Sequence, residues 1–168
     1  MFSNTTIEND QILIPMAGLG IGINEIRLRT FVGSCVAICL YDKSKKICGM
    51  AHVMLPKNNT GKSTFGTKFE GKYADEAINT IIKKMKEIHP DIILQAKIVG
   101  GAKIFDCIDN NSTLNIGKRN VSAIRLILKE KKIPLVSEHL SISNGCWATF
   151  DCNSQEFFVK ENNGEKII

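Results

Sequence analysis

The feature that most constrains the fold is a pair of apolar segments on either side of a short polar turn. Residues 36–41 are apolar and partly β-branched, and residues 47–55 are similar until Pro56 ends the pattern. Between them lie Asp42, Ser44 and three lysines. Two strand-like runs joined by such a turn are typical of a β-hairpin, so we expect two antiparallel strands here.

The rest of the chain mixes helix and strand signals without strict alternation. Residues 73–88 place apolar side chains at the spacing of a helix with one buried face, and Pro90 ends the pattern. A second helix is expected at residues 121–130, with Asn120 as its N-cap. Short apolar runs predict further strands at residues 12–14, 26–29, 96–99, 135–140, 147–150 and 156–159. Asn144-Gly145 fits the turn between the fourth and fifth of these. This order favours an α/β layered sandwich with mixed β-sheets and two main helices, and not a doubly wound fold.

Length and composition limit the class of protein. At 168 residues the chain fits a single domain over residues 1–168, with residues 1–10 expected to be flexible. The polar segment 56–71 is long for a compact domain, which is typical of functional or disordered loops. The net charge of +5 is modest, and no basic run with interleaved aromatics suggests nucleic-acid binding. The N-terminus lacks a signal-peptide pattern, and no apolar run approaches the ~20 residues of a membrane span. We therefore expect a cytoplasmic protein without membrane insertion.

Within the predicted hairpin, Cys35 and His52 come within reach of each other. If residues 43–46 form a four-residue loop, His52 pairs with Ala37, and Cys35 lies on the same sheet face as Ala37. Diagonal neighbours on one face are roughly 7–8 Å apart at the backbone. An odd loop length would instead place Cys35 and His52 on opposite faces.

A cysteine beside a histidine suits nucleophilic hydrolysis of an amide. The thiolate attacks, the imidazole takes the thiol proton, and the ion pair is expected to lower the pKa of the thiol. The resulting oxyanion needs fixed N–H donors, and the backbone amides of Gly33, Ser34 and Cys35 are candidates because Gly33 permits an unusual turn. On geometry alone, a Cys and a His in a hairpin are more often packed residues than a catalytic pair.

The remaining cysteines and glycines do not indicate a cofactor. Zinc sites usually need a second closely spaced cysteine pair, and none follows Cys35 and Cys39. The glycine-rich segment 18–22 lacks the helix that a dinucleotide-binding loop requires, because residues 24–30 look extended. No metal or cofactor is therefore expected. Five cysteines are expected to be small buried hydrophobic residues: Cys39, Cys48, Cys107, Cys146 and Cys152.

Five ordered blocks of sequence resemble a known family. Residues 33–42, GSCVAICLYD, and residues 49–56, GMAHVMLP, contain Cys35 and His52. The other blocks are KYAD, AKIVGGAKIF and NIGKRN, at residues 72–75, 96–105 and 115–120. Together the blocks are similar to the CheD family of chemoreceptor glutamine deamidases. Their order and spacing are more specific than any single motif.

The resemblance implies an activity, a fold and partners. A CheD-like chain would convert chemoreceptor glutamines to glutamates in chemotaxis adaptation, with glutamyl methyl esters as a further substrate, and would need no cofactor. Cys35 and His52 would occupy the catalytic positions of a papain-like arrangement within a layered α/β sandwich. The partners would be methyl-accepting chemoreceptors, as substrates, and a CheC-type phosphatase. An alternative is a non-catalytic module that docks onto that phosphatase and regulates it.

Two site assignments stay open at this point. The family's third catalytic residue is a threonine a few positions before the cysteine. Thr30 is the candidate here, although Arg29 occupies the position expected from the commonest spacing. Either a bulge absorbs one residue or another group orients His52. Residues 115–120 form either a turn and cap before the second helix or, with Asn120, a wall of the substrate cleft that exposes backbone N–H groups.

Overall fold

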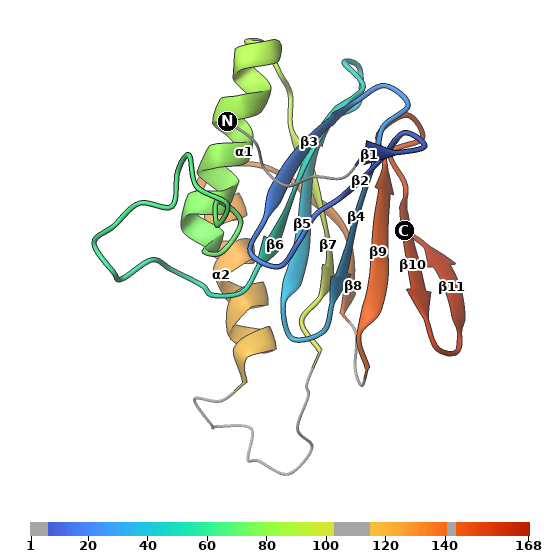
Figure 1. The fold of residues 1–168 in the computed structure, drawn as a ribbon. Coiled ribbons are helices and arrows are strands. Elements are labelled where there is room, and N and C mark those ends of the chain that lie inside the picture. Colours follow the sequence, from blue (N-terminus) through green and yellow to red (C-terminus); the bar gives the residue numbers. More distant parts are fainter. Residues whose placement is uncertain (1–6, 103–114, 141–143) are drawn as a thin grey trace.

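The computed structural model describes residues 7–102, 115–140 and 144–168. They form two β-sheets packed face to face, with both helices on the outer face of one sheet (Figure 1). The α/β layered sandwich with mixed sheets and two helices is therefore confirmed. Cys107 and the last three residues of the block at 96–105 lie outside the described residues. Within the described ranges, no helix is both long and apolar enough to cross a membrane.

The strands divide into a six-stranded and a five-stranded sheet. The larger sheet contains, in order, β1 (Ile7–Glu8), β2 (Gln11–Leu13), β4 (Arg27–Val32), β9 (Cys146–Asp151), β10 (Phe157–Glu161) and β11 (Gly164–Ile167). The smaller sheet contains, in order, β3 (Leu19–Ile23), β6 (Ile47–Val53), β5 (Val36–Asp42), β7 (Gln95–Gly100) and β8 (Leu135–Leu140). Both sheets are mixed, because β2 runs parallel to β4 and β7 runs parallel to β8, whereas the other neighbours are antiparallel.

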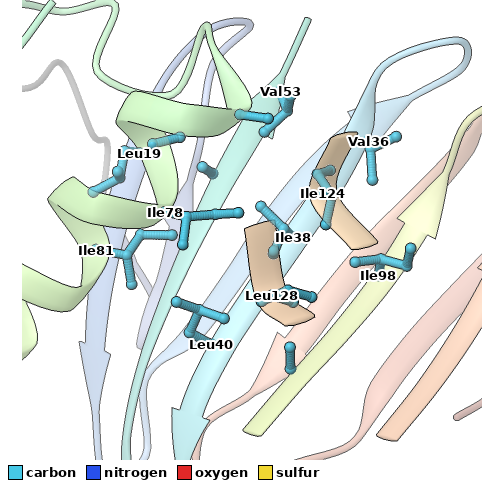
Figure 2. Close-up of a cluster of buried hydrophobic side chains, with 14 of the residues drawn as sticks. Leu19, Val36, Ile38, Leu40, Val53, Ile78, Ile81, Ile98, Ile124 and Leu128 are labelled. Atoms are coloured by element: carbon cyan, nitrogen blue, oxygen red, sulfur yellow. The ribbon is translucent and has the colours of Figure 1, made fainter. Parts of the chain in front are cut away.

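Strands β5 and β6 lie between two hydrophobic cores, so every residue in them is buried. Figure 2 shows the core on the helix side, where alternate side chains of β5 meet both helices. Ile38 of β5 lies in this core with Ile78 and Ile81 of α1 and Ile124 of α2. The other set of alternate side chains, which includes Ala37 and Met50, faces the second sheet. Full burial of each large side chain contributes roughly 1.5–3 kcal/mol, so this alternation strongly determines which residues face the space between the sheets.

The predicted strands are confirmed with shifts of a few residues at their ends, and three further strands were not predicted: β1, β3 and β11. Strand β3 falls in the glycine-rich segment 18–22. A Cβ on Gly20 would lie 3.3 Å from the Ile14 side chain, and one on Gly22 would lie 3.1 Å from the Cys48 sulfur. These glycines therefore let the sheet pack closely. Part of the segment expected to be flexible also forms a strand, since Ile7–Glu8 pairs with β2.

The two helices are α1 (Ala74–Ile88), which matches the prediction, and α2 (Ile116–Glu130), which begins earlier than the predicted residue 121. The N-cap of α2 is Asn115, whose side chain accepts a hydrogen bond from the backbone N–H of Lys118 at 3.1 Å. The assignment of Asn120 as the N-cap is therefore wrong.

Tertiary packing explains why the start of α2 was misplaced. The continuous apolar stripe from which the helix is predicted begins only at Val121, because Ile116 is the only apolar side chain larger than glycine among the helix residues before it. The first turn instead packs against the end of β7, and a Cβ on Gly117 would lie 2.6 Å from the Gly101 carbonyl oxygen. A glycine required for close approach gives no helix signal in the sequence.

The hairpin predicted at Asn144-Gly145 is also wrong. Strand β8 belongs to the five-stranded sheet, whereas β9 belongs to the six-stranded sheet, so the chain crosses between sheets at this point. Turn residues indicate a change of direction, but they do not indicate which sheet the next strand joins. Residues 141–143 of this connection lie outside the described residues.

The long segment 56–71 is fastened along α1. The Asn58 backbone N–H donates to Asp75 at 3.2 Å, and the Thr64 backbone N–H donates to Glu76 at 3.0 Å. Near the end of the segment, Glu70 forms a 2.8 Å ion pair with Lys84 of α1. These contacts give the segment a defined position beside the helix (Figure 1).

Candidate active site

The hairpin has the predicted register. Strands β5 and β6 pair antiparallel with Ala37 opposite His52, and Asp42 opens the four-residue loop. The Asp42 carboxylate accepts a hydrogen bond from the Ser44 backbone N–H at 2.9 Å, a contact that favours this turn. Both Cys35 and His52 therefore lie on the side of the hairpin that faces the other sheet.

The backbone around Cys35 is held against the end of β7. The Cys35 carbonyl accepts from the Gly101 N–H at 2.9 Å, and the Gly33 carbonyl accepts from the Ala102 N–H at 2.7 Å. A Cβ on Gly100 would lie 2.4 Å from the Cys35 carbonyl oxygen, and its φ of +116° also favours glycine. The Cys35 side chain packs on the core between the sheets and remains partly exposed.

A threonine from the other sheet contacts His52. Thr30, on β4, places its Oγ1 2.8 Å from His52 Nδ1, and both side chains are almost fully buried. The same hydroxyl donates to the Ile14 carbonyl oxygen at 2.9 Å. This backbone carbonyl belongs to the arrangement but carries no sequence signal, so it could not be predicted.

The hydrogen bonds around Thr30 determine which ring nitrogen of His52 holds the proton. A hydroxyl has one proton, and Thr30 gives it to the Ile14 carbonyl, which can only accept. The 2.8 Å contact therefore requires His52 Nδ1–H to donate to Thr30 Oγ1. Nε2 is then unprotonated. It is also buried, and no described group forms a hydrogen bond with it. His52 thus presents a free lone pair at Nε2.

Arg29 is directed away from His52. Alternate residues of a strand point to opposite faces, and the Arg29 guanidinium lies over the Trp147 ring on the outer face, 4.1 Å from its centroid. Of Arg29 and Thr30, it is therefore Thr30 that contacts His52.

Burial makes both members of the pair neutral at pH 7. Desolvation lowers the pKa of His52 to about 4. Desolvation also raises the pKa of the Cys35 thiol, although a hydrogen bond with the Ser34 side chain acts in the opposite direction. The expectation that the thiol pKa would be lowered is therefore wrong for this structure. The neutral imidazole can therefore accept a proton at Nε2.

Nitrogen-15 NMR of the imidazole is expected to reveal both the tautomer and the low pKa. At pH 7 the His52 signals should report a protonated Nδ1 and an unprotonated Nε2, with a titration midpoint of about 4. Thr30→Val is the matched variant, because it removes the acceptor and should abolish the tautomer preference. A midpoint near the ordinary value of 6.5 would contradict the buried, neutral imidazole.

The residues before the cysteine supply free backbone donors. No described residue accepts a hydrogen bond from the backbone N–H groups of Ser34 or Cys35. The Gly33 carbonyl, which shares a peptide group with the Ser34 N–H, accepts from the Ala102 N–H, so the orientation of the Ser34 amide is fixed. Unpaired backbone N–H groups are the kind of donor that an oxyanion requires.

Asn120 supports the end of β6 from the helix side. Its Nδ2 donates to the Met54 carbonyl at 3.0 Å, two residues after His52, and its side chain is fully buried. Its Oδ1 is also buried and has no hydrogen-bond partner. Asn120 therefore lies next to the hairpin end without presenting a surface to solvent.

The other described cysteines are free and buried, as expected: Cys39, Cys48, Cys146 and Cys152. Among the residues that the structure describes, no cluster of three or more His, Cys, Asp or Glu side chains could hold a metal ion.

Comparisons with known proteins agree on one family. The sequence model for CheD, described as CheD chemotactic sensory transduction, matches residues 54–161. A chemoreceptor glutamine deamidase CheD from Halalkalibacterium halodurans is 37% identical over 163 residues, which cover 95% of this chain and 99% of the relative. A probable chemoreceptor glutamine deamidase CheD from Methanococcus maripaludis is 35% identical over 156 residues, which cover 92% of this chain and 97% of the relative. One from Clostridium botulinum is 34% identical over 152 residues, which cover 89% and 92%. The chain belongs to the CheD family.

Proposed function

We propose that this protein is a glutamine deamidase that hydrolyses side-chain amides of chemoreceptors, with Cys35 as nucleophile and His52 as base. The names of the relatives support the reaction and the substrate. The observation that supports the mechanism is the unprotonated Nε2 of His52. The ring proton lies on Nδ1, because Nδ1–H donates to the Thr30 hydroxyl. Cys35 lies on the same side of the hairpin and is partly exposed.

The first half of the reaction forms a thioester. His52 Nε2 takes the proton from the Cys35 thiol while Sγ bonds to the amide carbon of the substrate. The carbonyl oxygen becomes an oxyanion, and the backbone N–H groups of Ser34 and Cys35 stabilise it, with Gly33 allowing the turn that directs them. Imidazolium then donates its proton to the amide nitrogen, the C–N bond breaks, and ammonia leaves.

The second half restores the enzyme. His52 accepts a proton from water as its oxygen attacks the thioester carbon. The C–S bond breaks, glutamate is released, and Cys35 recovers a proton. The net change is addition of water to glutamine with loss of ammonia. Throughout, Thr30 holds the imidazole in one orientation, and it accepts a stronger hydrogen bond when the ring becomes charged.

Conversion of an amide to a carboxylate adds one negative charge to the receptor, which is the change expected of a protein that acts in chemotaxis adaptation. The same acyl chemistry would also cleave a glutamyl methyl ester, since methanol replaces ammonia as leaving group. A CheC-type phosphatase remains a predicted partner, and a pull-down with such a phosphatase tests it.

Mass spectrometry tests the proposed reaction directly. Incubation with a chemoreceptor cytoplasmic fragment should convert specific glutamines to glutamates, each with a mass increase of about 1 Da. The fragment incubated alone controls for spontaneous deamidation. Equal conversion with and without the protein would contradict the proposal.

A further inference from the structure

A pocket lies beside the candidate active site and plays no part in the chemistry described above. Pro15, Met16, Gly18 and Leu19 form one side, and residues 67–70 form the other. Its volume is about 270 Å³. Small-molecule sites usually have roughly 300–1,000 Å³, so this pocket lies at the small end of that range and has room for one or two amino-acid side chains.

The segment that forms one wall of the pocket is hydrogen-bonded to His52 and Thr30. The Gly18 carbonyl accepts from the His52 backbone N–H at 3.0 Å. The Ile14 carbonyl, immediately before Pro15, accepts from the Thr30 hydroxyl at 2.9 Å. The same short segment therefore contacts both His52 and Thr30 on one side and encloses the pocket on the other.

The opposite wall has a fixed position. The Gly71 N–H donates to the Ala17 carbonyl at 2.8 Å, and a Cβ on Gly71 would lie 1.9 Å from the Gly18 carbonyl oxygen. Glu70 is held by its ion pair with Lys84 and by the Gly66 N–H at 2.8 Å. The pocket is thus built before any partner arrives, which lowers the entropy cost of binding.

The chemistry of the rim indicates what binds. Met16 is 65% exposed and Phe69 is 45% exposed, and methionine and aromatic side chains are enriched at protein interfaces. One lysine, Lys68, lines the pocket, and Lys57, Lys62 and Lys72 lie outside its lining on the same segment. Within the described part of the chain, no carboxylate forms an ion pair with any of them. The surface is therefore complementary to an apolar side chain flanked by acidic groups.

We propose that this pocket selects the substrate by taking an apolar side chain from the acidic polypeptide segment that carries the target glutamine. The inference rests on the proposed function, since it identifies the occupant as the receptor segment. Met16 and Phe69 contact the apolar side chain, and Lys68 attracts the carboxylates near it. The pocket supplies binding and leaves the reacting atoms to Cys35 and His52.

Steady-state kinetics on the receptor fragment test the pocket. Phe69→Ala and Met16→Ala should each raise KM about five- to thirty-fold, the cost of removing a central contact residue, with kcat nearly unchanged. Phe65→Ala is the matched control, because Phe65 is 48% exposed on the same segment but does not line the pocket. Its KM should stay at the wild-type value. Equal KM values for wild type and both pocket variants would overturn the inference.

A binding measurement separates failure of the pocket from failure of the reaction. In the inert Cys35→Ala background, adding Phe69→Ala should weaken binding of the receptor fragment by the same factor. If the wild-type protein converts glutamine but Phe69→Ala does not weaken binding in the Cys35→Ala background, the pocket inference is overturned and the proposed deamidase activity stands. Pocket-dependent binding without any conversion would support the pocket and overturn the deamidase.

The lysine contribution and a lipid alternative are tested together. Raising the salt concentration should weaken fragment binding, and less so for Lys68→Ala, because screening acts on exposed charges. Vesicles containing anionic lipid serve as the second probe. If Phe69→Ala weakened vesicle binding but not fragment binding, the occupant would be a membrane surface and the inference would be overturned.

Discussion

Replacing Cys35 with alanine is expected to reduce the rate of glutamine conversion at least about 10⁴-fold, because the reaction then has no nucleophile. The fold should survive, since the side chain is only partly buried and the backbone hydrogen bonds from Gly101 to the Cys35 carbonyl and from Ala102 to the Gly33 carbonyl do not involve it. The measurement is kcat/KM on the receptor fragment, followed by mass spectrometry, with thermal unfolding recorded for the same samples.

Cys39→Ala is the matched control for this change. Cys39 lies on β5 with the same orientation toward the other sheet, but it is fully buried. Its removal should lower the free energy of unfolding by about 1 kcal/mol and leave kcat/KM close to wild type. Conversion that survives in Cys35→Ala, or that is lost equally in Cys39→Ala, would remove Cys35 from its proposed role.

The hairpin was predictable because local rules determine it. Its two apolar runs, the polar turn and the even loop length are all within a short stretch of sequence, and together they place His52 opposite Ala37. Strand alternation then gives the face of Cys35. The proposed catalytic pair could thus be located from neighbouring residues alone, and the five family blocks added specificity.

The rest of the site depends on contacts that are distant in sequence. Thr30 reaches His52 from the other sheet, and its proton goes to the carbonyl of Ile14 on a third segment. The sequence does not state which sheet a strand joins, which is also why the connection at Asn144-Gly145 was misread as a hairpin. Backbone groups such as the Ile14 carbonyl have no residue signature at all.

The direction in which the pKa of Cys35 shifts also could not be predicted from the sequence. A Cys beside a His suggests a thiolate–imidazolium ion pair. Whether the ion pair or the two neutral side chains are favoured depends on how far both groups are removed from water. Here burial favours the neutral forms of both side chains. Burial on this scale follows from two sheets closing over the hairpin, which composition and spacing do not reveal.

Replacing His52 with glutamine is expected to reduce kcat/KM about 10³-fold at pH 7, within the range for loss of a general base. Glutamine can still hydrogen-bond with Thr30, but it cannot take a proton from the thiol. Because burial raises the pKa of Cys35, hydroxide in solution would have to ionise it. The variant's rate should therefore rise steadily with pH through the neutral and mildly alkaline range.

The wild-type profile should have a different shape, and this difference is the decisive measurement. His52 is neutral above a pKa of about 4, so kcat/KM should be nearly constant from about pH 5.5 to 8 and should fall as the pH approaches 4 and His52 becomes protonated. His139→Gln is the control, because His139 lies on β8 against Glu161 and should keep the wild-type profile. If His52 removes the thiol proton, hydroxide must do so in His52→Gln, and the two pH profiles must differ. Parallel profiles would therefore mean that another group removes the thiol proton.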